Sequence, residues 1–274
     1  MIFQTKRVLS GMFGGLASIM SILFILSLLL VNSKPPTPPS QAQAIVLNSQ
    51  KRNSEFSDVF KMFFQSLKSL FKSKSFVIAC FVFGASKPLL RTSTILLSSI
   101  LQNNFVNQTH INQKVGVSLA MGWLAFVIGG LLAGPLIKKT RRYKEVVAFA
   151  VFFLLLTCVS TTVGVAYQNM PSVMTSVIMQ GLFLGILCTS SFELLIEITY
   201  PEQPMCVSMI ATVVLGAFRL LYPFLGRVIL EVSGSTASTS LSVAMMALCT
   251  FLIFFIKPDY KREEANKNTS LEMK

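Results

Sequence analysis

The stretch that decides the fold runs from Val8 to Val31, VLSGMFGGLASIMSILFILSLLLV, and holds 24 residues without one ionisable side chain. About 20 apolar residues are enough for a helix to span the hydrocarbon of a bilayer. The apolar core of a signal peptide is shorter, about 7–15 residues, and a small-residue cleavage pattern follows it. Here the chain runs directly into Asn32 and Lys34 without that pattern. We therefore expect a retained transmembrane helix over residues 1–33.

Six more apolar segments follow along the chain. They cover residues 76–101, 115–137, 146–167, 171–198, 206–230 and 237–256. Only 13% of all residues are charged, against about 25% in a soluble domain. The sequence therefore predicts an all-α, polytopic membrane helix bundle with about seven transmembrane helices. The second segment is interrupted by Lys87, Pro88 and Arg91.

The remaining stretches are polar or mixed, and they define the other expected parts. We expect a cytosolic linker over residues 34–74, a six-helix bundle over 75–257 and a disordered cytosolic tail over 258–274. In the linker, apolar residues recur at three- and four-residue intervals between lysines: Phe56, Phe60, Phe63, Leu67, Leu70 and Phe71. This pattern predicts a basic amphipathic helix on the inner membrane leaflet, with a calmodulin-type target as the alternative.

The positions of the cations predict the orientation. Residues 34–74, 138–144 and the tail from Lys257 together hold 17 of the 24 Lys and Arg. Seven spans bring all three segments to one side, and an excess of cations marks the cytosolic face. We therefore expect the amino terminus outside, the carboxyl terminus in the cytosol, the plasma membrane as the location, and no nucleic acid partner despite the net charge of +13. Asn107, in the sequon Asn107-Gln108-Thr109, is a candidate glycosylation site on the outer side.

No pattern of catalytic or metal-ligating residues is present. The single histidine, His110, falls in a loop, where a surface histidine is expected and a heme ligand is the alternative. The cysteines show no CxxC spacing and lie in or beside apolar runs, so we expect small buried hydrophobes: Cys80, Cys158, Cys188, Cys206 and Cys249. The sequence predicts neither an enzyme nor a bound metal or cofactor.

Three cations, Lys87, Arg91 and Arg219, lie inside apolar segments. Each costs about 2.5–3.5 kcal/mol at the centre of a membrane helix, and groups of this kind usually face the bundle interior or a water cavity. A rise of 1.5 Å per residue places all three roughly 18–24 Å from the cytosolic edge. We expect them to line a substrate cavity. The alternative is that they snorkel or bind helix-end carbonyls.

Glu193 and Glu197 share a face near the cytosolic end of the segment 171–198. They lie about 10 Å or more from the level of Lys87 and Arg91, so direct pairing is not expected. Three pairs of glycines at a spacing of four predict close helix packing: Gly11 and Gly15, Gly130 and Gly134, Gly181 and Gly185.

Three motifs, in order, resemble those of one family. Residues 34–44, KPPTPPSQAQA, are similar to the end of the sixth helix in the feline leukaemia virus subgroup C receptor-related family of the major facilitator superfamily. Residues 192–202, FELLIEITYPE, resemble its tenth helix and following loop, and Lys139-Thr140 with Tyr143-Lys144 resembles its eight–nine loop more weakly.

The resemblance implies that the chain corresponds to helices six to twelve of a twelve-helix carrier, the C-terminal half of a major facilitator fold plus the preceding helix. Family members move choline, ethanolamine or heme. The expected function is therefore transport of a small organic solute by alternating access, with the chain expected to be incomplete as a carrier on its own. The alternative is a non-transporting binding or regulatory subunit that associates with a full-length carrier. A seven-helix receptor has the same topology, but the chain offers no Asp-Arg-Tyr run and no Asn-Pro near the last helix.

Two departures from the family pattern bear on the solute. An aromatic residue and a glutamine that contribute to the choline site in the family fall at Arg91 and Gly216. A cation repels a quaternary ammonium instead of holding it by cation–π attraction, so we expect an anionic or zwitterionic solute. The acidic position of the family's eight–nine loop falls at Lys138. Glu193, Glu197 and Lys138 are thus the candidates for a cytosolic gate, whose family contact is expected to be lost.

Overall fold

The computed structural model describes residues 2–30, 67–105, 110–202 and 204–257. Contacts divide the chain into two units, Met1–Asn48 and Ser49–Lys274, which are treated separately. The boundary falls inside the predicted linker. The predicted amphipathic helix lies largely outside the described residues, as does the tail 258–274. Its last part, residues 67–72, is helical, and Leu70 there is buried in the core.

The first unit contains one described helix, α1 (Ile2–Leu30). Every side chain of α1 that the structure describes is exposed within this unit. A Cβ atom at Gly11 or Gly15 would meet nothing within 4 Å, so the close packing predicted for this pair stays a prediction. A helix of this length with an apolar surface on all sides is suited to lipid.

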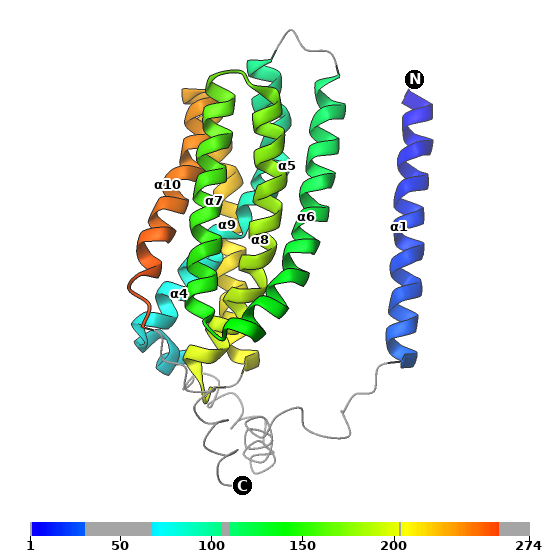
Figure 1. The fold of residues 1–274 in the computed structure, drawn as a ribbon. Coiled ribbons are helices and arrows are strands. Elements are labelled where there is room, and N and C mark those ends of the chain that lie inside the picture. Colours follow the sequence, from blue (N-terminus) through cyan, green and yellow to red (C-terminus); the bar gives the residue numbers. More distant parts are fainter. Residues whose placement is uncertain (1, 31–66, 106–109, 203, 258–274) are drawn as a thin grey trace. The chain divides into compact units, whose positions relative to one another are not determined.

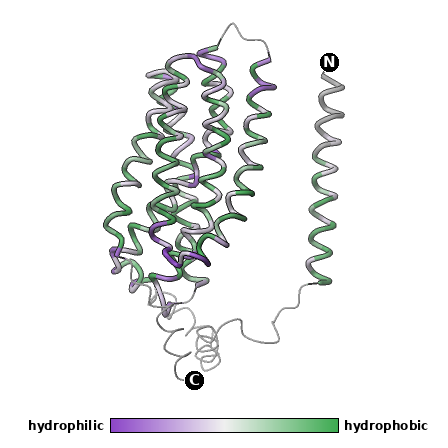
Figure 2. The backbone as a smooth tube through the Cα atoms, in the orientation of Figure 1, coloured by the Kyte–Doolittle hydropathy of each residue, from purple (hydrophilic) through white to green (hydrophobic). Residues whose placement is uncertain are grey.

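The second unit contains the other six spans, drawn in Figure 1: α4 (Lys74–Ser86) with α5 (Pro88–Asn104), α6 (Ile111–Thr140), α7 (Tyr143–Ala166), α8 (Met170–Thr199), α9 (Pro204–Ser233) and α10 (Ser235–Ile253). With α1, seven segments among the described residues are long and apolar enough to cross a membrane. Apolar residues fill the middle of the bundle and hydrophilic residues gather towards its two ends (Figure 2). The predicted all-α membrane bundle is confirmed.

The second span is two helices, because α4 ends and α5 begins at Lys87. Pro88 occupies the first turn of α5, where a proline without an amide hydrogen is tolerated. In the middle of a continuous helix the same proline would remove a backbone hydrogen bond. The interruption of the second span therefore falls at Lys87, the first of the three cations that lie inside apolar segments.

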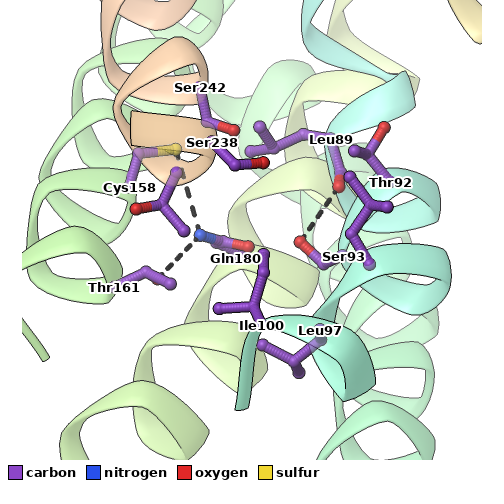
Figure 3. Close-up of a pocket in the computed structure, with 12 residues that line it drawn as sticks. Leu89, Thr92, Ser93, Leu97, Ile100, Cys158, Thr161, Gln180, Ser238 and Ser242 are labelled. Carbon is purple, nitrogen blue, oxygen red and sulfur yellow. Dashed lines mark hydrogen bonds between the residues drawn. The ribbon is translucent and has the colours of Figure 1, made fainter. Parts of the chain in front are cut away.

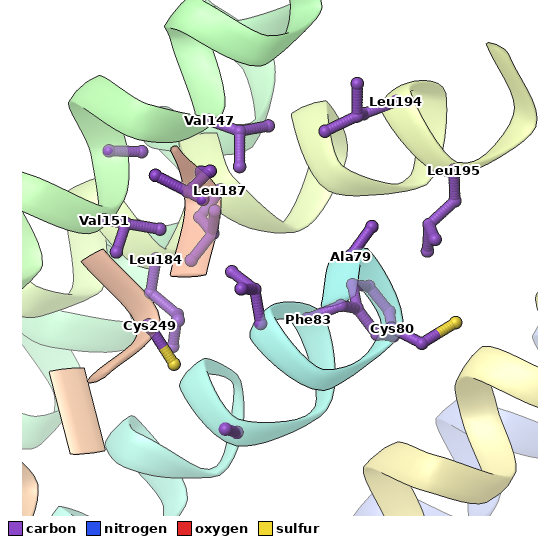
Figure 4. Packing of buried hydrophobic residues seen from close by; sticks show 14 of the residues in the cluster. Ala79, Cys80, Phe83, Val147, Val151, Leu184, Leu187, Leu194, Leu195 and Cys249 are labelled. Carbon is purple, nitrogen blue, oxygen red and sulfur yellow. The ribbon is translucent and has the colours of Figure 1, made fainter. Parts of the chain in front are cut away.

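The core lies where α4, α7, α8 and α10 meet. In Figure 4, Ala79, Cys80 and Phe83 of α4 face the same interior as Leu194 and Leu195 of α8. Val147 and Val151 of α7 and Cys249 of α10 belong to the same cluster, which also includes residues of α5, α6 and α9. Phe83, Leu195 and Cys249 have no exposed surface, so this contact holds four helices of the bundle together.

The helices α6 and α8 cross closely at glycines. A Cβ atom on Gly181 would collide with the carbonyl of Gly122, and one on Gly185 would collide with the carbonyl of Phe126. On α6 the critical residue is Gly129, whose added Cβ would collide with the carbonyl of Leu182. The predicted role of Gly181 and Gly185 is therefore correct.

The predicted role of Gly130 and Gly134 is wrong for Gly134, where a Cβ atom would meet nothing within 4 Å. At Gly130 an added Cβ would make only ordinary contact with the Thr189 side chain, at 3.6 Å. We call the line of contact between α6 and α8 the α6–α8 seam. The α6 residues on this seam are Gly122 and Gly129, which are seven residues apart and so lie on one face of the helix, whereas Gly134 lies on another face.

Lys144, in the first turn of α7, links α7 to the chain that follows α10. Its Nζ donates hydrogen bonds to the carbonyl oxygens of Phe254, at 3.3 Å, and Ile256, at 2.6 Å. A cation at the carboxyl end of a helix binds the last unpaired carbonyls and complements the helix dipole. The connection before α7 and the end of α10 therefore lie at the same end of the bundle, as the count of seven spans requires.

Candidate functional site

A cationic cluster forms where the span α4–α5 is interrupted. The Lys87 ammonium lies 3.6 Å from the centre of the Phe83 ring and 4.2 Å from that of Phe192. The two rings are themselves in edge contact, with centroids 4.6 Å apart. Both distances lie within the range of a cation–π interaction. The interruption before Pro88 thus directs the Lys87 side chain onto two aromatic rings from α4 and α8.

Two further groups interact electrostatically with Lys87, the Cys188 thiol of α8 and the Arg219 guanidinium of α9. Lys87 and Cys188 are half-buried, whereas Arg219 is exposed. Nearby, Phe218 packs its ring against Phe81 at 5.3 Å, which fixes this part of α9 against α4. The positive charges of Lys87 and Arg219 repel each other.

Arg91 stands one turn beyond Lys87 on α5 and is exposed. Of the three predicted cavity cations, Lys87 and Arg219 therefore interact electrostatically with each other, and the cavity role of all three stays a prediction. The third cation, Arg91, lies on the exposed face of α5.

The three candidate gate residues lie towards the opposite end of the bundle from the 105–110 connection. Glu197 is 2% exposed and Glu193 is half-buried, and each interacts with neighbouring groups. Lys138, near the end of α6, is exposed. Glu193 directly follows Phe192, whose ring contacts the Lys87 ammonium. The Lys87 ammonium therefore contacts the residue of α8 that precedes Glu193.

Sequence reasoning missed a buried polar group in the middle of α8. The Gln180 amide nitrogen donates to the Thr161 hydroxyl at 3.1 Å and lies 3.9 Å from the Cys158 sulfur, both on α7. Gln180 is 3% exposed. An uncharged amide does not stand out in a count of ionisable residues. The available signal was a lone glutamine inside an apolar helix, where such groups bond to neighbouring helices.

Gln180 borders a cavity of about 40 Å³ (Figure 3). Residues of α5, α7, α8 and α10 line it: Leu89, Thr92, Ser93, Leu96, Leu97, Ile100, Cys158, Thr161, Gln180, Ser238, Thr239 and Ser242. A second and wider hollow, about 530 Å³, lies between α7 and α8, with Phe153 and Phe183 at one end and Asn169 and Ser172 at the other.

Two other predicted positions lie at the 105–110 connection. Asn107, the candidate glycosylation site, is outside the described residues. His110 precedes α6 in a left-handed conformation, with φ of 62°, and is exposed. Among the described residues no group of three or more His, Cys, Asp and Glu side chains could hold a metal ion.

Comparison with known proteins identifies relatives. A family model described as the Major Facilitator Superfamily matches residues 89–272. The choline/ethanolamine transporter FLVCR2 of Rattus norvegicus is 24% identical over 260 residues, covering 95% of this chain and 46% of that protein. The choline/ethanolamine transporter FLVCR1 of Mus musculus is 26% identical over 276 residues, covering 97% and 46%. The predicted relationship to this family of the major facilitator superfamily is confirmed.

The chain spans about half the length of the curated relatives it matches. Among solved structures, a D-xylose-proton symporter matches with a TM-score of 0.55 and 14% sequence identity, over 72% of this chain and 50% of that one. At this identity the likeness concerns the fold alone.

Proposed function

Because the chain belongs to the major facilitator superfamily, whose members are transporters and not enzymes, we propose that it takes part in moving a small organic solute across a membrane. Facilitators work by alternating access, in which two halves rock about a site near mid-membrane. The helices α4 to α10 supply one such half, and the cluster around Lys87 is its candidate solute site.

We further propose that the solute is anionic or zwitterionic and not choline. The observation that carries this proposal is the position of the Lys87 ammonium over the Phe83 and Phe192 rings, 3.6 and 4.2 Å from their centres. A quaternary ammonium binds by lying over aromatic faces, and here a resident cation already covers them. Arg219 adds a second positive charge. Heme, through its carboxylates, fits this charge better than choline does.

The proposed orientation follows from the distribution of cations. The 138–144 loop and the tail from Lys257 face the cytosol, the amino terminus faces outward, and the membrane is the plasma membrane. Glu193, Glu197 and Lys138 then lie towards the cytosolic side, where they are proposed to gate the solute path. Asn107 is proposed as a glycosylation site on the outer side.

Cys188 provides a direct test of charge preference. Among the described cysteines it alone is half-buried, whereas Cys80, Cys158, Cys206 and Cys249 are buried. The purified chain in detergent is treated with a sulfonate-bearing methanethiosulfonate and, separately, with its trimethylammonium counterpart, which resembles choline. The rate of modification of Cys188 by each reagent is divided by the rate at which the same reagent modifies a small thiol free in solution, which corrects for the reagent's intrinsic reactivity. We expect the anionic reagent to be favoured at least about tenfold, since a unit charge about 8 Å away contributes about 2 kcal/mol at an effective dielectric constant of 20.

Lys87→Gln and Arg219→Gln should each reduce that preference. Arg227→Gln is the matched control on the same helix, because Arg227 pairs with Glu231 at 3.0 Å on the exposed surface. Cys188→Ser identifies the reacting thiol. Equal corrected rates for the two reagents, or a preference for the trimethylammonium reagent, contradict the charge proposal.

Transport itself is tested by uptake into proteoliposomes containing the chain, with choline, ethanolamine and heme as probes. We expect heme flux to exceed choline flux and to fall in Lys87→Gln. Robust choline flux that Arg91→Ala abolishes would be incompatible with a site that repels cations.

The second candidate function is a non-transporting regulatory subunit that associates with a full-length carrier. In that case the chain alone gives no flux with any probe but co-purifies with a full-length carrier. Flux from the chain without such a partner would exclude it.

A further inference from the structure

The cavity beside Gln180 is a second candidate site, distinct from the cluster around Lys87. It lies among α5, α7, α8 and α10, and its volume is about 40 Å³. Gln180 is the eleventh residue of α8, so the cavity lies about 15 Å along the helix from its first turn. A space of this size holds a small ion or two to three water molecules. Its lining, not its size, decides between these occupants.

Most hydroxyl hydrogens around the cavity are already donated to helix carbonyls. Ser93 donates to Leu89, at 3.1 Å, and Ser238 donates to Gly226, at 2.7 Å. Thr161 donates to Thr157, at 2.9 Å, and Thr239 bonds in the same way within α10. A hydroxyl that donates its only hydrogen elsewhere offers lone pairs alone. These side chains therefore present acceptors to the cavity.

The side chain of Gln180 adds a further hydrogen-bond acceptor to this cavity lining. Its amide nitrogen is turned towards Thr161 and Cys158 on α7, so its oxygen points the other way, into the space between Ser93 and Ser238 (Figure 3). That oxygen is buried and has no hydrogen-bond partner. The Thr92 hydroxyl, on a residue 7% exposed, is also buried and unpartnered. A buried polar atom without a partner is costly, and each one in a folded protein calls for an explanation.

We propose that this cavity binds a small monovalent cation of the Na⁺ type through neutral oxygens. Hard cations prefer oxygen ligands, and divalent ones usually take carboxylates, none of which lines this cavity. A single positive charge satisfies several acceptors at once, including the Gln180 and Thr92 oxygens. Ser93 and Ser242 at the edge are only half-buried, which leaves a route for exchange with water.

A cation bound in this cavity would be repelled by the positive charge of Lys87. Cys188, beside Lys87, is eight residues from Gln180 along α8, a rise of about 12 Å. At that separation one positive charge weakens the binding of another by about tenfold at an effective dielectric constant of 20. Lys87→Gln should therefore tighten binding of the cation. A cavity that holds only water has no such response.

The test measures thermal unfolding of the purified full chain in NaCl, KCl and N-methylglucamine chloride at equal ionic strength. We expect NaCl to raise Tm saturably, by about 3 °C at tenfold above the dissociation constant, and to do so more than KCl. Gln180→Met and Thr92→Val remove one oxygen site each and should abolish the sodium-specific shift. Either variant suffices if the other fails to fold.

Thr175→Val is the matched control, since its hydroxyl donates to Pro171 at 2.9 Å on an exposed part of α8. It should keep the sodium shift, and Lys87→Gln should move its midpoint to lower sodium concentration. Identical Tm values in the three salts, or a sodium shift that survives in a folded Gln180→Met or Thr92→Val variant, overturn the proposal. Because no solute is present, this outcome is independent of the charge preference tested at Cys188.

Discussion

Lys144 shows how one side chain can secure two distant parts of the chain. Replacing it with methionine removes both hydrogen bonds to the carbonyls of Phe254 and Ile256 but keeps the length of the side chain. A charge-assisted hydrogen bond contributes about 1.5–3 kcal/mol, and the longer, exposed bond to Phe254 adds little to that of Ile256. We expect Lys144→Met to destabilise the protein by about 2 kcal/mol, measured as a lower Tm in detergent.

The control removes an equal charge nearby. Lys139→Met, at the exposed end of α6, should leave Tm within about 1 °C, because isolated surface charges contribute little. If both variants lose the same stability, general charge and not the bonds to α10 explains the effect.

At the residue scale, the sequence identifies which side chains are unusual but not what they contact. Lys87 and Arg219 stand out as cations in apolar segments, and the structure brings them together. Phe192 and Cys188 do not stand out, since aromatic and thiol side chains are ordinary in a membrane helix. Gln180 was overlooked because it carries no charge, and its unpartnered oxygen depends on four helices meeting.

At the scale of elements, the crossing of α6 and α8 gives a matched pair of variants. Gly129→Ala places a methyl group against the carbonyl of Leu182, whereas Gly134→Ala, less than two turns away, meets open space. We expect Gly129→Ala to cost about 1–3 kcal/mol from overpacking. Gly134→Ala should change the stability by less than about 1 kcal/mol, because the helix propensity of alanine is offset by contact between its Cβ atom and the following Pro135. Thermal unfolding of both variants checks this, and equal stability would show that the seam tolerates a Cβ atom.

The helices themselves are the part that sequence predicts best. Each span follows from a run of apolar residues, which is a local property, so all seven were found. Glycine spacing marks the seam on α8 correctly, at Gly181 and Gly185. On α6 it selected Gly130 and Gly134, because spacing alone does not tell which face of a helix meets its neighbour. That face depends on the crossing angle of the pair.

For the whole molecule, the orientation can be tested with two engineered cysteines in a Cys188→Ser background. In the proposed topology Tyr167, 81% exposed between α7 and α8, faces the outside, and the exposed Lys139 faces the cytosol. An impermeant maleimide should label Tyr167→Cys in intact cells and Lys139→Cys only after permeabilisation. The reverse pattern would invert the proposed topology, and labelling of both from outside would disprove an odd number of crossings between them.

The α6–α8 seam also bears on how this half of a carrier would deform. The backbones of α6 and α8 touch at Gly122, Gly129, Gly181 and Gly185, so no side chains lie between the two helices there that could rearrange. The two helices should therefore move together as one rigid unit. Bending that accompanies solute passage would then concentrate at the joint before Pro88, where the second span is already divided and where the Lys87 ammonium would swing with it.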